Sequence, residues 1–343
     1  MTAIKMGKHS GKSVCRTLAL VWFVFVVLST LPLFASLFTA FHPLFDSLAD
    51  IRIPLAFFTI LLGFPLIFTK LRQKAVFPII FVAALISLSL NDGGVSPNSG
   101  MIKSSTFKLL QANLRFDNQT PEKFLALIEK EKPDIITVQE ASAKWRNFFQ
   151  NNNLTIIGCV ADNDRAGATG VILSDRFLSR YGFVNSPVVT CYDATATHGY
   201  VAKIKLQSDK PDYPPLEIVS VHLAWPWPFG QNLQLDELES GALRNDLEHK
   251  VSQTIVAGDF NSVTWSNTVS RMERLTATRH ISGIGPTWLS YSFPASLRPY
   301  LGLPIDQILL SEDIKPISVK RLAFFGSDHL PVLAELSFTY DRF

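Results

Sequence analysis

The sequence predicts N-terminal transmembrane α-helices followed by one α/β domain. Residues 1–91 contain three long stretches without Asp, Glu, Lys or Arg, which are filled mainly with Leu, Val, Ile, Phe and Ala. Residues 106–343 instead alternate short apolar, β-branched runs with segments of helical spacing. Residues 92–105 lie between these regions and are rich in Gly, Ser, Asn and Pro, which is typical of a linker.

The three uncharged stretches are residues 17–45, 53–69 and 75–91. A spanning helix needs roughly 20 residues, with about 17 as a lower limit, so the first stretch is easily long enough and the other two are marginal in length. We expect three transmembrane helices at about 17–41, 53–69 and 75–91. A signal peptide has an apolar core of only about 7–15 residues, and two more apolar segments follow here. The remaining alternative is a hydrophobic soluble helical domain.

The orientation of these helices follows from the basic residues in the short loops. The N-terminal tail carries four Lys and Arg residues and the loop at 69–74 carries three, whereas the loop at 41–52 carries only Arg52. Basic loops stay on the cytoplasmic side of the membrane. Three spans would therefore place the C-terminal domain on the far side. We expect a multi-pass protein of a bacterial inner (plasma) membrane, with this domain periplasmic or extracellular.

The net charge of +3 arises from the N-terminal region. Residues 1–100 contain 8 Lys and Arg against 3 Asp and Glu, whereas residues 101–343 contain 24 against 26. The positive balance therefore reflects membrane topology. It gives no support for a strongly basic nucleic-acid-binding surface on the C-terminal domain.

Three cysteines occur, and none belongs to a Cys/His zinc pattern. Cys15 lies at the start of the first apolar stretch, whereas Cys159 and Cys191 lie in the C-terminal domain. If that domain is periplasmic, the latter two could form a disulfide. Two buried free thiols are an equal alternative, because sequence does not report their distance.

Strands and helices alternate through the C-terminal domain. Thr120 and Pro121 indicate the start of a helix, with Phe124, Leu127 and Ile128 on its buried side. A further helix is expected at residues 233–247. Strands are predicted at residues 107–112, 134–138, 155–160, 170–173, 200–206, 216–222, 254–257, 307–310 and 332–338. This pattern favours two sheets packed face to face with helices outside.

Polar side chains gather at or just after the ends of these predicted strands. Strand ends are where a sheet presents polar groups to a ligand, so we expect these residues to converge on one metal site. They are Asn113, Glu140, His222, Asp259, Asn261, Asp306, Asp328 and His329.

Six short motifs containing these residues resemble those of the endonuclease/exonuclease/phosphatase superfamily. They are Leu110-Gln111-Ala112-Asn113, Val138-Gln139-Glu140, Ser220-Val221-His222-Leu223, Ala257-Gly258-Asp259-Phe260-Asn261, Pro304-Ile305-Asp306-Gln307-Ile308 and Gly326-Ser327-Asp328-His329-Leu330-Pro331. The resemblance extends over residues 107–338. It implies a four-layered α/β sandwich with two packed, mostly antiparallel sheets. It also implies divalent-metal-dependent hydrolysis of a phosphoester.

The resemblance also implies a set of metal-binding residues. Glu140 would make the principal contact with Mg²⁺ or Mn²⁺, and Asn113 would align it. Asp328 would serve at a second or alternative metal position. A hard cation held by carboxylates neutralises the charge that develops during phosphoester hydrolysis, so the residue types suit the chemistry. The pattern is compatible with one metal or two.

The catalytic residues implied by the resemblance are His222, Asp259, Asn261, Asp306 and His329. Asp259 would orient or deprotonate the attacking water, and Asn261 would hydrogen-bond the phosphoryl oxygens. His329 would contact the scissile phosphate or act as a base, with its ring oriented by Asp306. His222 would act as general acid on the leaving-group side.

The substrate is less clearly indicated by the sequence. An aromatic loop at residues 223–230 (LAWPWPFG) follows His222 and could stack nucleobases, rest in a membrane interface or cap the core. Trp288, Tyr291 and Phe293 form a second aromatic group that could line the same cleft or belong to the core. Nucleic acid, a phospholipid and a small phosphodiester are all possible substrates.

A catalytically silent domain that acts as a membrane-bound binding protein is the alternative function. The acidic, amide and histidine positions are all intact, and this favours an enzyme.

Overall fold

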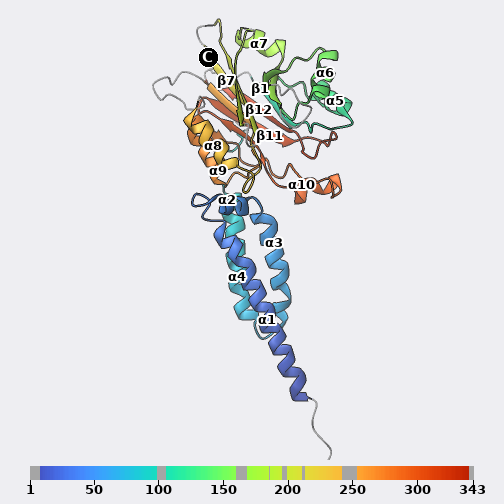
Figure 1. Cartoon of the computed structure of the whole chain (residues 1–343), viewed down its shortest axis with the longest axis vertical. Coiled ribbons are helices and arrows are strands. Elements are labelled where there is room, and N and C mark those ends of the chain that lie inside the picture. The colour runs from blue at the N-terminus through green and yellow to red at the C-terminus, as the bar shows by residue number, and fades with distance from the viewer. Residues whose placement is uncertain are drawn as a thin grey trace, which may run out of the picture. The chain divides into compact units, whose positions relative to one another are not determined.

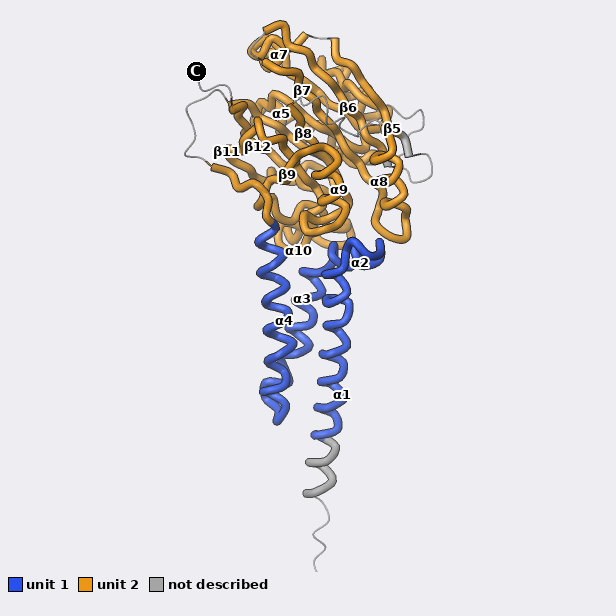
Figure 2. The backbone as a smooth tube through the Cα atoms, turned by 90° about the vertical axis from the view of Figure 1, so that its left-hand side faces the viewer, with its two compact units in different colours: residues 1–92 blue, residues 93–343 orange. Residues whose placement is uncertain are grey.

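The computed structural model describes residues 8–98, 106–159, 168–184, 186–194, 199–210, 213–241 and 253–339. The chain divides into two compact units, residues 1–92 and 93–343, which Figure 2 colours separately. Val160, at the end of one predicted strand, and the last part of the helix predicted at 233–247 lie outside the described residues.

The first unit is helical. Its elements are α1 (Lys8–Ala35), α2 (Pro43–Asp50), α3 (Arg52–Gly63), the 3₁₀ helix η1 (Phe64–Phe68) and α4 (Arg72–Leu90). Two segments, Cys15–Ala35 and Arg72–Leu90, are long and apolar enough to cross a membrane. A third span exists only if α2 and the helical segment Arg52–Phe68, which are bent by 67° relative to each other, count as one. The first helix ends at Ala35, before the limit of 41 that we expected.

A small apolar core and a buried arginine hold this helical unit together. Leu33, Ala56 and Val82, from α1, α3 and α4, pack in one cluster. At the start of α3, Arg52 donates hydrogen bonds to Ser36 Oγ (2.8 Å) and Ser89 Oγ (3.1 Å). Burying a guanidinium group is unfavourable unless it is hydrogen-bonded, so this residue fixes where α3 meets the C-terminal ends of α1 and α4.

The second unit contains two six-stranded mixed sheets (Figure 1). In order across the first sheet, the strands are β11 (Ile314–Arg321), β12 (Val332–Phe338), β1 (Thr106–Asn113), β2 (Ile135–Gln139), β4 (Thr169–Leu173) and β3 (Ile157–Cys159). Across the second they are β5 (Val188–Ala194), β6 (Gly199–Leu206), β7 (Leu216–His222), β8 (Gln253–Asp259), β10 (Asp306–Leu310) and β9 (Arg279–His280). Among the strands of the described residues, only β1–β2 and β7–β8 are parallel pairs. The predicted pair of mostly antiparallel sheets is confirmed.

Alternation along each strand divides the apolar residues between two faces. On β1, Leu109 belongs to the core between the sheets, whereas Leu110 faces the outer helices. On β8, Ala257 and Val256 divide in the same way. Both sheets are therefore apolar on their two faces, which requires a helical layer on each outer side.

Helices supply these outer layers. The first sheet packs against α5 (Pro121–Glu131) and α6 (Ala143–Asn151) through Phe124, Trp145 and Phe149. The second packs against α8 (Gln231–Ser240) and α9 (Asn267–Thr276) through Leu235 and Met272, among others. The predicted four-layered sandwich is thereby confirmed. The part of this unit that the structure describes also contains α7 (Asp175–Tyr181), η3 (Ala295–Leu297) and α10 (Arg298–Leu301).

Two local expectations differ from the structure. Thr120 occupies the N-cap of α5, but its hydroxyl makes no cap and instead donates to Phe325 O (3.1 Å). The described part of the segment predicted to be a linker, residues 92–98, also contacts the second unit. Val95 pairs with Ile281 beyond β9, and Asn98 N donates to Pro316 O (3.1 Å). An edge strand attracts an extended segment because its backbone groups are otherwise unpaired.

A disulfide links Cys159 on β3 to Cys191 on β5, and so joins the two sheets. The alternative of two free thiols is therefore wrong. The bridge closes a loop over a sequence separation of 32, which limits the conformations of the unfolded chain. Cys15 is exposed and free.

Candidate active site

The topology of the two sheets brings the predicted site residues to one end of the sandwich. Parallel strands end at the same edge, and Asn113 pairs with Gln139 across β1 and β2 while His222 pairs with Asp259 across β7 and β8. Because β10 runs antiparallel to β8, its first residue, Asp306, lies opposite Asp259. Four strands thus end at this edge and a fifth begins there.

Three residues at or near these strand ends have unusual backbone geometry. A Cβ atom on Gly258 would lie 1.9 Å from Val221 O, so only glycine allows β8 to approach β7 immediately before Asp259. Glu140 and Asn261 both adopt left-handed conformations, with φ of 55° and 48°. Asparagine tolerates this region, whereas for glutamate it is a strain of the kind found at functional sites.

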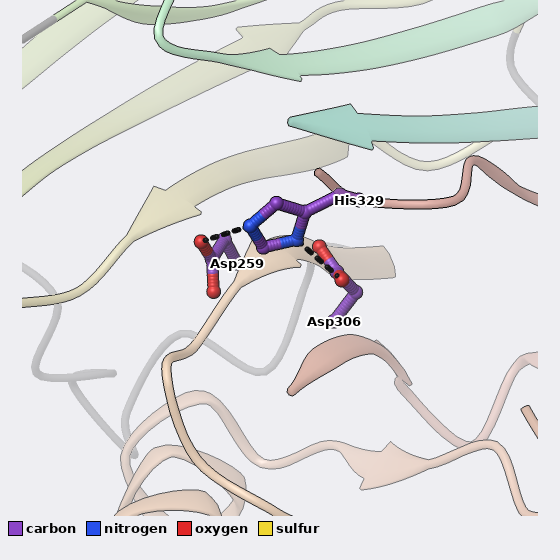
Figure 3. A group of neighbouring side chains, drawn as sticks. All are labelled: Asp259, Asp306 and His329. Atoms are coloured by element: carbon purple, nitrogen blue, oxygen red, sulfur yellow. Dashed lines mark hydrogen bonds and ion pairs between the residues drawn. The ribbon is translucent and has the colours of Figure 1, made fainter. Parts of the chain in front are cut away.

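At the centre of the site, His329 lies between two carboxylates (Figure 3). Its Nδ1 is 2.8 Å from Asp306 Oδ2, and its Nε2 is 3.5 Å from Asp259 Oδ2. All three residues are buried, with exposed fractions of 4% or less. Each ring nitrogen of His329 therefore lies next to a carboxylate.

These contacts shift the pKa values of the cluster. Burial lowers the pKa of His329, but the charges of Asp306 and Asp259 and the Asp306 hydrogen bond outweigh it and raise the pKa to about 10. Burial is the main cause that raises the pKa of Asp259 to about 6, with the charge of Asp306 adding to it and that of His329 opposing it. At neutral pH the histidine is a cation, and Asp259 titrates close enough to neutrality to exchange a proton.

Asn113 joins the second pair of carboxylates. Its Nδ2 donates to Glu140 Oε1 and to Asp259 Oδ2, each at 3.0 Å. Its Oδ1 accepts the backbone N–H of Arg115 (3.0 Å), which fixes the orientation of the amide. The other Glu140 oxygen accepts the N–H of Phe116 (3.0 Å). Asn113 therefore aligns Glu140 with Asp259.

This donor set fits a hard divalent cation. Glu140 and Asp259 offer carboxylate oxygens next to each other, and Mg²⁺ is bound through one or two carboxylates while keeping several waters. Asp259, Asp306 and His329 also lie with their potential ligand atoms within 4.8 Å of one another. The hydrogen bond from His329 Nδ1 to Asp306 holds the ring in one orientation. Glu140 would be the principal oxygen ligand of the cation, and the Asn113 amide places Asp259 beside it. A bound metal would supply Lewis-acid polarisation of a phosphoryl oxygen.

The other predicted residues differ in how closely they join this cluster. His222 Nε2 lies 3.7 Å from Asp259 Oδ2. The backbone N–H of Asn261 donates to Asp259 Oδ1 (2.9 Å), and its side-chain Nδ2 donates to Leu223 O (2.9 Å), which leaves one amide N–H for a substrate. The Asp328 carboxylate accepts from Trp288 Nε1 (3.2 Å), and no hydrogen bond to another predicted residue is found for it in the described chain.

Several residues that support the site had no role in the sequence prediction. Ser327 Oγ donates to Asn113 O (2.8 Å) and accepts the N–H of His329 (3.1 Å). Arg298 is buried and donates to Ser327 O (3.1 Å). Gln111 Nε2 donates to Asp306 Oδ1 (2.9 Å). Gln111 precedes Asn113 by two residues on the same strand, so alternation was a usable signal for it.

Three exposed aromatic residues follow His222 in the chain. Trp225, Trp227 and Phe229, in the loop after His222, are 46%, 48% and 65% exposed. The Trp225 ring lies 5.3 Å from that of Trp288, the residue that hydrogen-bonds Asp328. The interpretation of this loop as a cap of the core is therefore wrong for these three side chains.

The raised pKa values predict how stability depends on pH. Folded His329 holds its proton up to about pH 10, whereas the unfolded chain releases it near 6.5. Its stabilising contribution is therefore complete below pH 6.5 and is lost as the pH rises to about 10. We expect the thermal midpoint of the metal-free protein to fall over this range, and to fall less steeply in Asp306→Asn.

The exposed residue Asp313 provides the matched control, since Asp313→Asn removes the same charge from the surface. Differential scanning fluorimetry from pH 6 to 10 measures all three proteins. A profile for Asp306→Asn as steep as that of the wild type would contradict the assignment.

Comparisons with known proteins agree with this geometry. The sequence model of the Endonuclease/Exonuclease/phosphatase family matches residues 110–329, a range that includes every predicted site residue. No curated protein matches the chain in sequence.

Three solved structures are similar in fold. The endonuclease/exonuclease/phosphatase from Bacteroides vulgatus has a TM-score of 0.53 and 15% identity, and the match covers 68% of this chain and 99% of that one. The human Nocturnin catalytic domain has a TM-score of 0.51 and 16% identity, over 69% and 97% of the two chains. TDP2 from D. rerio, complexed with a single-strand DNA product, has 0.50 and 15%, over 68% and 99%. The sequence match and the shared fold together show that the chain belongs to the endonuclease/exonuclease/phosphatase family.

Proposed function

We propose that this protein is a membrane-anchored, divalent-metal-dependent phosphodiesterase that attacks its substrate with an activated water. One observation carries the proposal: a buried imidazolium and an amide-linked pair of carboxylates meet at Asp259. Asn113 joins Asp259 to Glu140, and His329 lies on its other side. A buried acidic cluster that also holds a cationic ring suits the hydrolysis of an anionic ester.

The residues divide the chemistry between them. Asp259, with its pKa raised to about 6, accepts a proton from the attacking water near neutral pH. We assign His329, with its pKa raised to about 10, to stabilising the negative charge on the phosphoryl oxygens. Asp306 orients the His329 ring, and Asn261 offers its free N–H to the phosphoryl group. We assign His222 to the leaving-group side.

The first test is hydrolysis by the purified full chain with Mg²⁺ or Mn²⁺. The substrates are DNA, RNA, phospholipid and bis-p-nitrophenyl phosphate. We expect activity that disappears with EDTA. Asp259→Asn and Glu140→Gln each remove a carboxylate from the reaction, so we expect kcat to fall by at least about 100-fold. Glu312→Gln, an exposed position, is the control. If wild type and both variants are equally inert on every substrate, the catalytically silent binding protein becomes the better interpretation.

The rim of the site favours a membrane-borne substrate. The loops at residues 114–120, 223–230 and 286–305 contain only two basic residues, Arg115 and Arg298. The first is paired with Asp117 and the second is 1% exposed. Polynucleotide binding depends on Lys and Arg contacts with phosphates, whereas exposed Trp and Phe are suited to a membrane interface. We therefore favour a phospholipid headgroup as the substrate.

Substitutions in the aromatic loop test this preference. Trp227→Ser combined with Phe229→Ser removes two exposed rings, and we expect hydrolysis of phospholipid in vesicles to fall by about tenfold or more. Hydrolysis of soluble bis-p-nitrophenyl phosphate should stay within about twofold of the wild type. Val184→Ser, a 46% exposed apolar position on another part of the domain, is the matched control. Equal losses on both substrates would contradict a role in lipid capture.

Three spans and a periplasmic catalytic domain complete the proposal. The disulfide between Cys159 and Cys191 supports an oxidising compartment. A reporter enzyme that is active only in the periplasm, fused after Phe343, should be active in a bacterial host. The same reporter fused after Gln73, in the basic loop, should be inactive. Activity of only the second fusion would overturn the proposed orientation.

A further inference from the structure

The side chain of Gln111 lies inside the sandwich, directly behind the site. It is completely buried and comes from β1 in the first sheet. The side chain that it contacts, Asp306, begins β10 in the second sheet. Gln111 therefore links the two sheets at the level of the site.

Both amide N–H groups of Gln111 are used. Nε2 donates to Gln139 Oε1 and to Asp306 Oδ1, each at 2.9 Å. If the amide were turned over, Gln111 Oε1 would face two acceptors and the contact would be repulsive. Gln139 is itself held by a hydrogen bond from its Nε2 to Ser220 Oγ (3.1 Å). The orientation of the Gln111 amide is thus fixed from both sides.

The Asp306 carboxylate receives one donor on each oxygen. Gln111 binds Oδ1, and His329 Nδ1 binds Oδ2 at 2.8 Å. Within the described chain, His329 is the only basic residue that forms an ion pair with Asp306. Rotation of the carboxylate would break both contacts, so the Gln111 hydrogen bond sets the direction in which Asp306 meets the imidazole.

This arrangement is not the most stable one for a core position. Gln111 Oε1 is buried and has no hydrogen-bond partner among the described residues. A buried polar atom without a hydrogen-bond partner destabilises the folded state. A residue selected only for packing at this position would be apolar, as its neighbour Leu109 is. The buried, unpaired Gln111 Oε1 is explained if the two amide N–H groups are needed to hold Gln139 and Asp306 in place.

We propose that Gln111 is a positioning residue for the reaction, acting through Asp306 to hold the His329 ring against the substrate phosphate. The proposal rests on the phosphodiesterase function given above. It predicts an effect on turnover and little effect on substrate binding, because Gln111 itself does not contact the substrate.

A double-mutant cycle on the full chain tests this role. Gln111→Met keeps the length of the side chain but removes the amide, and we expect kcat for bis-p-nitrophenyl phosphate to fall by about 10- to 100-fold with KM within about twofold. In an Asp306→Asn background the same substitution should change kcat by less than about twofold, since the residue through which it acts is already altered. An equal loss in both backgrounds would overturn the proposal.

Gln253→Met is the matched control. Gln253 is a buried glutamine at the opposite end of β8 from Asp259. Its substitution should leave kcat unchanged, which separates positioning from a general effect of removing a buried amide. If Gln111→Met fails to fold, as judged by its thermal transition, Gln111→Asn retains an amide but withdraws it by one methylene, and the same loss of kcat is expected. An unchanged kcat in a folded Gln111 variant would contradict the proposal.

A readout independent of turnover uses the metal-free protein labelled with ¹⁵N-histidine. The Nδ1–H proton of His329 should give a slowly exchanging low-field NMR signal, identified by its loss in His329→Gln. We expect the signal to disappear in Gln111→Met and to persist in Gln253→Met. Persistence in both variants would overturn the proposal. If the wild type hydrolyses no substrate, the phosphodiesterase function fails while this measurement still decides whether Gln111 orients the ring.

Discussion

The burial of His329 between Asp259 and Asp306 is the interaction on which the rest of the site depends. An isolated buried carboxylate or imidazolium is strongly unfavourable, whereas ions that pair and hydrogen-bond compensate part of their lost hydration. Here one cation serves two carboxylates, so a negative charge remains. Part of it is relieved by the raised pKa of Asp259. The remaining negative charge attracts a divalent cation, and the proposed reaction requires such a cation.

This buried charge is possible because the layer between the sheets changes character along its length. Over most of the strands the inward residues are apolar, as Leu109 and Ile218 are. Near the site they become polar, and Gln111, Gln139 and Ser220 form a hydrogen-bonded series across both sheets. A core made only of hydrocarbon could not hold Asp306 in place. The polar series provides donors at a fixed position, which define the orientation of Asp306.

Sequence alone predicted the residues at strand ends better than those behind them. Asn113, Glu140 and Asp259 were recognisable because each follows an apolar run and carries a group suited to metal chemistry. Gln111 was harder to interpret, since a glutamine within a strand is compatible with a solvent-facing position. Its role depends on Asp306, which is distant in sequence and belongs to the other sheet.

Local sequence signals also failed where long-range contacts compete with them. The Thr120 hydroxyl bonds to Phe325 instead of capping α5, and Val95, within the predicted linker, pairs beyond β9. The strand β11 was missed because Lys315, Lys320 and Arg321 interrupt the apolar pattern used to find strands. For Thr120 and Val95 the deciding partner lies far along the chain, where propensity carries no information.

The disulfide and the number of membrane spans constrain each other. With two spans, the second unit would lie on the same side of the membrane as the basic N-terminal tail, where cytoplasmic reductants keep thiols reduced. With three, it lies on the opposite side, where a bridge between Cys159 and Cys191 persists. The bent pair of helices between α1 and α4 is therefore the element that decides compartment. Its central residues are uncharged from Ile53 to Thr69, and the basic loop that follows is suited to retention in the cytoplasm. The bend of 67° does not exclude a span, because helices with internal breaks cross membranes when neighbouring helices satisfy the freed backbone groups, and α3 packs here against both α1 and α4.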